Sequence, residues 1–352
     1  MNKYIFKSGH NSIQIPHDEE QNGLIEPFVS FDDLLFLHYA NVYHRRAIKI
    51  KAGMLSQVEL EDSDIYKILP QGVSPKMFLF EFCYNLELYG NAPIEKAGTP
   101  SNYNLYNIPA VEWRTNKARE IYQLDRNGNK HKLDGYYFKY YSPSSRFYGE
   151  PDYLATMLSI LTNKEADNYN HSFFKNGARP DLAIVHTNSE PSEEQIKTYQ
   201  TFFGSNFRGS QNAHKTLLAY ASNGVGEKDA DIRFEKLGGV EDISFEKLKK
   251  VTRDEIAAAH GIPPRLLGIM DAGGLGGGGE LIGQLQQFNE IEIKPKIELI
   301  ESFFESIGIK VVLKAVDITN FKDDGAIVTE LVGRGIINVN EARSILGWQK
   351  NI

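Results

Sequence analysis

The run of this sequence that most suggests chemistry is a glycine-rich stretch at residues 271–279. Gly274, Gly276 and Gly279 have the G-x-G-x-x-G spacing with which many proteins bind the pyrophosphate of a dinucleotide. That motif works only after a buried strand, because the strand and the following helix aim backbone N–H groups at the phosphates. The residues upstream instead predict a helix and a Pro-Pro turn, so the spacing alone does not indicate a dinucleotide site.

A phosphate-binding loop of the P-loop type is also disfavoured. Such a loop needs Lys and then Ser or Thr after its last glycine, and this chain has Glu280 and Leu281 there. A carboxylate at that point repels phosphate, although it suits the N-terminus of a helix. A nucleotide-dependent enzyme that uses the glycine-rich loop is therefore an alternative function and not the main prediction.

Other side chains with reactive groups show no catalytic spacing. The nine histidines contain no H-E-x-x-H or Cys/His metal-binding pattern. The single cysteine, Cys83, lies in the apolar segment FLFEFCYNL, which predicts a buried core thiol. His260 precedes Gly261 at a predicted helix end, where packing or a contact with the helix terminus is its expected role. We therefore expect no enzyme activity, no catalytic residue, no metal and no cofactor.

The strongest basic cluster is Lys247, Lys249, Lys250 and Arg253. On a helix, residues four apart lie on one face, so Lys249 and Arg253 point the same way. Two cations on one face are able to contact DNA phosphates without reading sequence. The more ordinary interpretation is a solvated helix face.

The elements around these residues follow from periodicity and end signals. Residues 31–57 predict a packing helix with Leu34, Leu37, Tyr39 and Val42 near helical spacing, and residues 75–90 predict a second, opened by Pro75 and closed by Gly90. Between 104 and 141 we expect β-hairpins, with Asn127-Gly128 as a tight turn. Further elements are expected at the following segments: helices at 152–175, 192–203, 244–260, 280–304, 323–335 and near 338–348, and strands in DLAIVHT, TLLAYA, IRFEKL and KVVLKAVDI.

Composition and charge limit the class of protein. With 352 residues, 41% hydrophobic and 24% charged, the chain is long enough to bury a core and to form two or three subdomains. Its net charge of −7 argues against a repressor or nuclease, which use a basic surface to neutralise phosphates. The N-terminus lacks the apolar core of a signal peptide, and no apolar run has the length of a bilayer span, so we expect no membrane insertion.

Four segments carry a resemblance to a known family. In chain order they are YYSPSSRFYGEPDYL, YNHSFFKNGARPDLAIV, IAAAHGIPPRLLG and FNEIEIKP. Together they resemble the portal proteins of tailed bacteriophages and related prophages, and the resemblance covers nearly the whole chain from about residue 25. It implies a non-enzymatic subunit of a ring at one capsid vertex, through which double-stranded DNA is packaged and ejected.

The resemblance implies an α+β portal fold. Its parts would be a mixed α/β wing, a two-helix stem, a small α/β clip, a long kinked tunnel helix and a short helical C-terminal region. The expected boundaries are a flexible N-terminal arm at 1–24, the first part of the wing at 25–150, stem helix 1 at 151–178, the clip at 179–243, stem helix 2 at 244–264, the tunnel loop, tunnel helix and returning wing strand at 265–320, and crown-proximal helices at 321–352.

The same resemblance gives the glycine-rich stretch a role without a nucleotide. It implies a tunnel loop that contacts DNA in the channel and consists of Gly273, Gly274, Leu275, Gly276, Gly277, Gly278 and Gly279. Glycine allows such a loop to change shape because it lacks a Cβ. The helix that follows contains Pro295, which removes a backbone donor and predicts a kink; two separate helices are the alternative.

The partners implied by the resemblance are those of a capsid vertex. They are further copies of the chain in a ring, expected to be a dodecamer, together with double-stranded DNA bound without sequence preference, the terminase large subunit, capsid and scaffold proteins, and a neck or head-completion protein. The expected location is the virion, after assembly in the cytoplasm of the bacterial host. A structural adaptor ring without DNA passage is the second alternative function.

Overall fold

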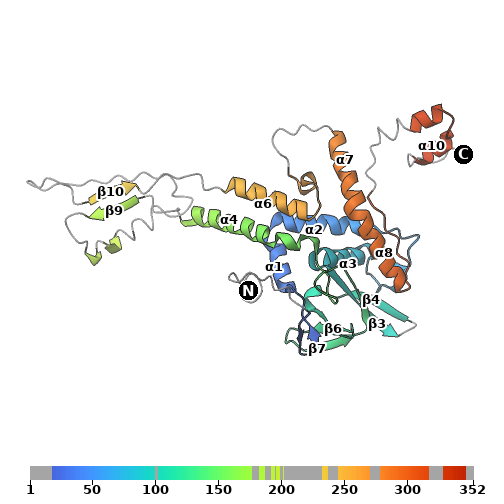
Figure 1. Cartoon of the computed structure of the whole chain (residues 1–352), viewed down its shortest axis with the longest axis horizontal. Helices are drawn as coiled ribbons and strands as arrows, with labels where there is room; N and C mark the ends of the chain where they lie inside the picture. Colours follow the sequence, from blue (N-terminus) through green and yellow to red (C-terminus); the bar gives the residue numbers. More distant parts are fainter. Residues whose placement is uncertain are drawn as a thin grey trace, which may run out of the picture. The chain divides into compact units, whose positions relative to one another are not determined.

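The computed structural model describes residues 18–99, 102–176, 182–186, 192–194, 196–198, 201, 232–236, 245–269, 278–316 and 328–345. The chain divides into two compact units (Figure 1). Unit 1 comprises Met1–Ile160 and Asp254–Ile352, and unit 2 comprises Leu161–Arg253. The mixture of helices and antiparallel sheets confirms the predicted α+β class, whereas the division into wing, stem, clip and tunnel stays a prediction.

Two helices, not one, occupy the region predicted as a helix at 31–57. Helix α1 (Phe31–Ala40) and helix α2 (Val42–Leu55) are separated by Asn41, whose backbone is extended at φ −139° and ψ 128°. The Asn41 side chain accepts hydrogen bonds from the backbone N–H groups of Tyr43 (2.9 Å) and His44 (3.0 Å). An asparagine that caps a new helix start in this way ends the preceding helix.

The break also changes which side chains are buried. Leu34 and Leu37 pack in the core as expected, but Tyr39 and Val42 are 67% and 70% exposed. The prediction that these two residues belong to the packing face was wrong, because the change of direction at Asn41 turns them away from the core.

Helix α3 (Pro75–Tyr89) has the predicted ends. Proline occupies its first turn, and Gly90 closes it in the left-handed conformation at φ 69°, with its N–H donating to the Leu86 carbonyl. A short 3-10 helix η1 (Ile65–Ile68) precedes it. Cys83 lies on the buried face of α3 with no exposed area, as predicted, and burial raises the pKa of its thiol.

Two antiparallel sheets complete this part of unit 1. One has the order β4–β3–β8, and the other has the order β1–β2–β5–β6–β7. The predicted Asn127-Gly128 turn joins β6 to β7, and Asp125 accepts from the N–H groups of Asn127 and Asn129 at 2.8 Å each. The strand bounds are β1 Glu20–Gln21, β2 Leu24–Ile25, β3 Asn91–Thr99, β4 Asn102–Asn107, β5 Trp113–Thr115 (after the 3-10 helix η2, Ala110–Glu112), β6 Ile121–Leu124, β7 Lys130–Leu133 and β8 Gly135–Lys139.

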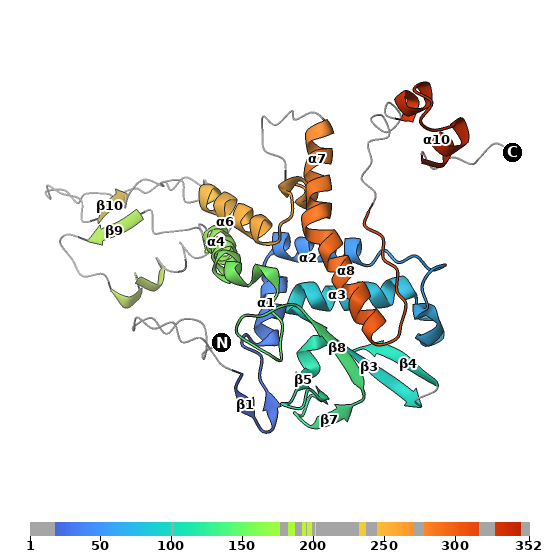
Figure 2. The ribbon, with the colours of Figure 1, turned by 45° about the vertical axis from the view of Figure 1, so that its right-hand side comes forward.

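A long helical segment packs onto α3 and the first sheet (Figure 2). It consists of α7 (Gly278–Phe288), the π-helical turn η6 (Asn289–Ile293) and α8 (Lys294–Ser306). Ile297, Ile300 and Phe304 form its buried face, and Phe304 lies 5.1 Å from the ring of Phe82 on α3. This packing places the segment that follows the glycine-rich stretch firmly on the core of unit 1.

The returning wing strand expected in KVVLKAVDI is not a regular strand. Its described residues form a single isolated bridge, between Leu313 and Val58. Two backbone hydrogen bonds flank that bridge, from the Glu59 N–H to the Val312 carbonyl (2.8 Å) and from the Lys314 N–H to the Gln57 carbonyl (2.7 Å). A bend and turn at residues 60–62 interrupt the ladder, and the partner segment then contacts the expected strand again through the Asp64 N–H, which donates to the Lys310 carbonyl at 2.7 Å.

Two helices connect the units along the sequence. The segment predicted as a helix from Asp152 begins as a 3-10 helix, η3 (Asp152–Thr156), and becomes α-helical as α4 (Met157–Asn176). Helix α6 (Glu246–Ala259) matches the prediction for 244–260 and is followed by the 3-10 helix η5 (Pro264–Leu267). Each of α4 and α6 has one end in unit 1 and the other in unit 2.

Within unit 2, α4 and α6 are joined by polar and aromatic contacts. Asn163 of α4 donates to the Thr252 hydroxyl of α6 at 2.8 Å, and both side chains are buried. Tyr169 meets Phe245 edge to face at 5.2 Å. The expected strands in DLAIVHT and IRFEKL are confirmed as β9 (Leu182–His186) and β10 (Ile232–Lys236), an antiparallel pair, whereas TLLAYA lies outside the described residues.

The C-terminal region begins and caps its last helix as predicted. Residues 328–333 are helical, and α10 (Val339–Ile345) starts after Asn338. Asn338 and Glu341 cap each other: the Glu341 N–H donates to the Asn338 side chain at 2.9 Å, and the Asn338 N–H donates to the Glu341 carboxylate at 2.7 Å. Among the described residues, no helix is both long enough and apolar enough to cross a bilayer.

Candidate functional site

The predicted tunnel loop falls mostly outside the described part of the chain. Gly273, Gly274, Leu275, Gly276 and Gly277 are not described, and Gly278 and Gly279 are the first two residues of α7. The described segment before the loop is the 3-10 helix η5, not a strand. A dinucleotide fingerprint requires a strand at that position, so this context does not support the nucleotide-binding alternative.

Pro295 lies in the first turn of α8, directly after the π turn. The helical backbone is unbroken from 278 to 306, so the alternative of two separate helices is wrong. The Lys294 N–H donates to the Asn289 carbonyl five residues back, which is the hydrogen bond of a π turn. Proline cannot donate to the residue four before it, and a π turn is one way in which a helix absorbs that loss. The kink itself stays a prediction.

The two predicted DNA-facing cations lie on α6 in unit 2. Lys249 is half-buried and forms an ion pair with Asp167 of α4. Arg253 is also half-buried, one helical turn further along. The charge of Lys249 is therefore compensated within the subunit, and a contact with DNA would have to compete with Asp167.

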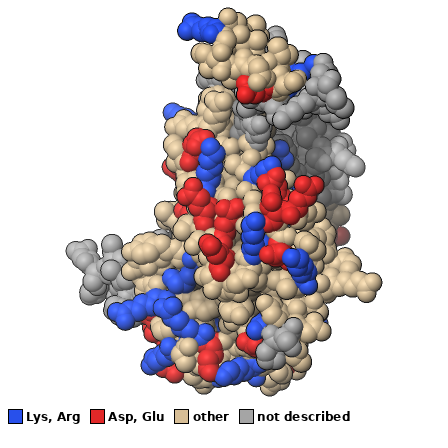
Figure 3. All heavy atoms as spheres, turned by 90° about the vertical axis from the view of Figure 1, so that its right-hand side faces the viewer, with Lys and Arg blue, Asp and Glu red and all other residues tan. Residues whose placement is uncertain are grey.

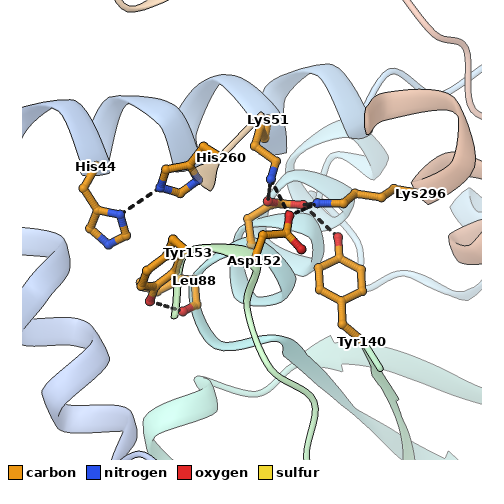
Figure 4. Close-up of polar contacts among 9 residues, drawn as sticks. His44, Lys51, Leu88, Tyr140, Asp152, Tyr153, His260 and Lys296 are labelled. Carbon is orange, nitrogen blue, oxygen red and sulfur yellow. Dashed lines mark hydrogen bonds and ion pairs between the residues drawn. The ribbon is translucent and has the colours of Figure 1, made fainter. Parts of the chain in front are cut away.

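A buried charge cluster in unit 1 is the most unusual polar site in the described structure (Figure 4). It consists of Lys51 on α2, Glu87 on α3, Asp152 in η3 and Lys296 on α8. Lys51 Nζ lies 2.7 Å from Glu87 Oε2 and 2.7 Å from Asp152 Oδ2. Lys296 Nζ lies 3.0 Å from Glu87 Oε1 and also pairs with Asp152. Two cations and two anions thus compensate one another.

Burial strengthens the coupling inside this cluster. The side chains of Lys51 and Glu87 are 0% and 2% exposed, and those of Lys296 and Asp152 are 12% and 34% exposed. Burial alone would lower the pKa of Lys51, but the carboxylates of Glu87 and Asp152 outweigh it and raise that pKa. Burial likewise favours neutral carboxyl groups, yet the two lysines lower the pKa of both Glu87 and Asp152. Lys51, Glu87 and Asp152 are therefore charged at neutral pH.

Tyr140 completes the cluster from the end of β8. Its hydroxyl donates to Glu87 Oε1 at 2.7 Å, and Lys296 Nζ lies 4.9 Å from the centre of its ring. Burial, and then the neighbouring Glu87 charge, raises the pKa of Tyr140 well above its usual value. The phenol therefore remains a donor and fixes Glu87.

A pair of buried histidines lies beside the cluster. His44 Nδ1 of α2 is 2.9 Å from His260 Nε2, which follows α6, so one ring donates to the other. Tyr153 stacks on His260 at 5.3 Å and donates through its hydroxyl to the Leu88 carbonyl at 2.6 Å (Figure 4). Burial lowers the pKa of both histidines well below the usual value, and for His260 the charge of Lys51 adds to this effect. Both rings are neutral at pH 7.

The arrangement links several elements of unit 1. The charges face one another, and a small pocket of about 20 Å³ near Phe31, Tyr89 and Tyr148 is lined mainly by apolar side chains and by none of the four charged residues. No group of three or more His, Cys, Asp or Glu in the described ranges could hold a metal ion. The cluster and the histidine pair instead connect α2, α3, η3, α8 and the end of α6.

Sequence reasoning missed this cluster. A signal was present, because Lys51 and Glu87 stand at core-facing positions of otherwise apolar helical segments, IKIKAGML and CYNLELYG. A charged residue at such a position is buried only if it finds a partner. Nothing in the local sequence indicates which residue that partner is.

Comparison with known proteins shows which family the sequence matches. The sequence matches the phage portal protein family over residues 43–347. It is 24% identical over 322 residues to a probable portal protein of Haemophilus phage HP1, covering 86% of this chain and 87% of that protein. An uncharacterised protein of Rickettsia felis is 32% identical over 165 residues, which are 46% of this chain and 40% of that protein. With a second relative, from Rickettsia bellii, the chain spans 51% of the relative's length, so it covers about half of these two proteins.

Solved structures give the same result at the level of fold. The chain superposes on a chain from the neck of a native gene transfer agent particle, computed with C12 symmetry, with a TM-score of 0.61 at 18% identity; 91% of this chain and 94% of that chain are covered. It also superposes on a HK97 family phage portal protein from Corynebacterium diphtheriae, with a TM-score of 0.53 at 11% identity over 81% and 95% of the two chains. The chain therefore has the α+β fold of portal subunits. With the family match over most of its length, the chain belongs to the phage portal protein family.

Proposed function

We propose that this protein is the subunit of a portal ring at the capsid vertex of a tailed phage or a prophage-derived particle. The match to the phage portal protein family across residues 43–347 carries this proposal. In this function the chain is a structural protein without an enzymatic reaction of its own. Its ring forms the channel for packaging and ejection of double-stranded DNA, docks the terminase large subunit during packaging and contacts the capsid, scaffold and neck proteins.

The ring is a homododecamer in this proposal. The C12 symmetry applied to the neck of the gene transfer agent particle supports that number, since the chain shares the fold of one of its chains. In a heterologous interface, one surface of a subunit meets a different surface of the next. Such an interface closes into a ring when the rotation from one subunit to the next is a whole-number fraction of a full turn.

The tunnel loop and the stem cations are the proposed DNA contacts. The glycine-rich stretch before α7 would project into the channel, and Lys249 with Arg253 would form a belt around it. The overall charge of −7 fits a channel that holds DNA only weakly, because tight binding to phosphates would slow passage.

Electron microscopy of the assembled protein tests the proposal. We expect rings with a central hole in negative stain, a native mass of twelve subunits and no ATP hydrolysis by the protein alone. Rings without a hole would favour a structural adaptor, and nucleotide hydrolysis by the purified chain would favour the enzyme alternative. Monomers at every concentration and salt would contradict the portal function.

A second experiment addresses the loop. Replacing Gly276, Gly277, Gly278 and Gly279 together by alanine restricts the backbone without removing a buried side chain. We expect ring formation to persist while DNA packaging or retention falls in a phage complementation assay. Packaging equal to that of the wild type would mean that the loop is only a spacer.

A further inference from the structure

Helix α8 presents an acidic surface with an apolar centre. Pro295 and Leu299 lie on the face of α8 opposite its buried face, and Ile291 of the π turn lies one turn before them. The side chains of Leu299 and Ile291 are 54% and 60% exposed. The carboxylates of Glu298 and Glu305 share this face, because positions three, four and seven apart align on a helix. We name these five residues the acidic α8 face. Figure 3 shows Asp and Glu side chains in the middle of the side on which α8 is drawn in Figure 1, with Lys and Arg side chains among them.

The corner between α1 and α2 presents the opposite charge around a similar apolar centre. Tyr39 and Val42 are the most exposed side chains of this corner, at 67% and 70%. Arg45 lies over the Tyr39 ring at 5.2 Å, so the apolar side chains of α1 are continuous with the cations of α2. Arg46 and Lys49 are exposed on the same face of α2. We name these five residues the basic α1–α2 corner.

Lys294 aligns with Glu298 on α8 but forms its ion pair with Glu290, so it does not pair with the carboxylates of the acidic α8 face. Among the described residues, Glu298, Glu305, Arg46 and Lys49 form no ion pair within the chain. Exposed apolar side chains flanked by charges of one sign are typical of protein interfaces, in which the charge sets the partner and the register. Both surfaces belong to unit 1, and α2 and α3 lie between α1 and α8 in both views (Figures 1 and 2).

We infer that the acidic α8 face of one subunit binds the basic α1–α2 corner of the next subunit. The occupant is a second copy of this chain because each surface has the charge and the apolar centre that the other lacks. The two surfaces differ and lie apart on unit 1. Each subunit that binds through one surface leaves the other surface free for the next subunit, and such a head-to-tail contact suits a closed ring. The inference rests on the proposed ring function and specifies where the subunits meet.

Charge reversal on each surface separately, and on both together, tests the interface. The first variant carries Glu298→Arg and Glu305→Arg, and the second carries Arg46→Glu and Lys49→Glu. Either variant by itself brings like charges together at the interface. We therefore expect the protein concentration needed for assembly, measured by mass photometry, to rise roughly tenfold or more. The chain with all four substitutions restores opposite charges and should assemble again. An equimolar mixture of the two variants should also form rings, with the variants alternating.

Matched controls separate this idea from misfolding and from failure of the proposed function. The exposed residues Lys76 and Glu61 provide reversals elsewhere on unit 1, Lys76→Glu and Glu61→Arg, that should assemble like the wild type. Circular dichroism melting checks that every variant folds. A wild-type chain that never forms rings would overturn both the ring function and this interface. Wild-type rings together with unimpaired reversed variants, or with no recovery in the fourfold variant and the mixture, would overturn the interface alone.

Discussion

Lys51 and Glu87 form the inner half of the buried cluster, and Lys296 and Asp152 form its outer half. The inner side chains have almost no exposed area, whereas Asp152 is 34% exposed and reaches water. Removing one charge of a buried pair leaves its partner unpaired in a poorly solvated place, which costs more than the pair itself contributes. Water replaces part of the lost interaction at the outer half. The two lysines therefore differ in their effect on stability even though they contact the same two carboxylates.

Substitution of each lysine by methionine measures this difference. We expect Lys51→Met to lower the free energy of unfolding of unit 1 by about 3–5 kcal/mol, and Lys296→Met to lower it by about 1–3 kcal/mol. Adding Glu87→Gln to Lys51→Met removes the unpaired charge and should recover part of the loss. Urea unfolding curves provide the measurement. Equal losses of unfolding free energy for Lys51→Met and Lys296→Met would contradict the division of the cluster into an inner and an outer half.

The buried histidines predict a dependence of stability on pH. Burial, together with the charge of Arg45, lowers the pKa of His38 to about 4, and the pKa values of His44 and His260 are also lowered. A histidine with a lowered pKa binds fewer protons in the folded state than in the unfolded state. Its contribution is complete above the unfolded value of 6.5 and is lost as the pH falls toward the folded pKa.

We therefore expect the stability of unit 1 to fall between about pH 6 and pH 4 by about 1.4 kcal/mol per pH unit for each histidine that is neutral only in the folded state. Chemical unfolding at several pH values measures the slope. His38→Gln should reduce the slope. If the stability is constant over this range, the buried histidine side chains bind protons equally in the folded and unfolded states.

At the scale of elements, helix ends and close backbone approaches hold the parts of unit 1 in place. Gly90 ends α3 in the left-handed conformation, and its carbonyl accepts from the Tyr140 N–H at 2.9 Å. A Cβ on Gly90 would lie 2.7 Å from the Glu150 carbonyl carbon and 2.8 Å from the Pro151 nitrogen. The segment that leads into Asp152 and the buried cluster thus packs directly against the end of α3.

Gly90→Ala should be much more damaging than an alanine at another left-handed glycine. We expect a loss of about 3 kcal/mol or more, because backbone strain of about 1–2 kcal/mol adds to a clash with backbone atoms that cannot rotate away. Gly72 has φ 87° but open space around a Cβ, so Gly72→Ala is the matched control and should cost about 1 kcal/mol. Thermal unfolding of both variants gives the comparison, and similar losses would mean that the close approach is not rigid.

At the scale of the whole molecule, the proposed ring would determine what the individual surfaces contact. Lys249 pairs with Asp167 inside one subunit, so a DNA contact would have to exchange that partner for phosphate. Many weak contacts of this kind around a ring bind DNA at any rotation and respond to salt, because each phosphate contact releases counterions. The proposed DNA belt is therefore testable apart from assembly.

Lys249→Glu with Arg253→Glu should change the length or retention of packaged DNA while rings still form. Lys249→Glu with Asp167→Lys is the control, because it rebuilds an ion pair between α4 and α6 without the cation at 249. Packaged DNA is sized by pulsed-field electrophoresis, and assembly is measured by native mass. Normal packaging in the first variant would indicate that Lys249 only joins the two helices through Asp167.

Local signals in the sequence determined where several elements begin and end, and they supported the family resemblance. Pro75 with Gly90, the Asn127-Gly128 turn and the Asn338–Glu341 cap are each decided within a few residues, so they are readable without a partner segment. Tertiary structure alone decided which charges are buried and which apolar side chains are exposed. Lys296 meets Glu87 across 209 positions of the chain, and Tyr39 is exposed because Asn41 redirects the helix that follows. The first outcome depends on segments distant in the sequence, whose approach is set by packing of the whole core. The second has a local cause at Asn41, but which face of α1 is buried is still set by that core.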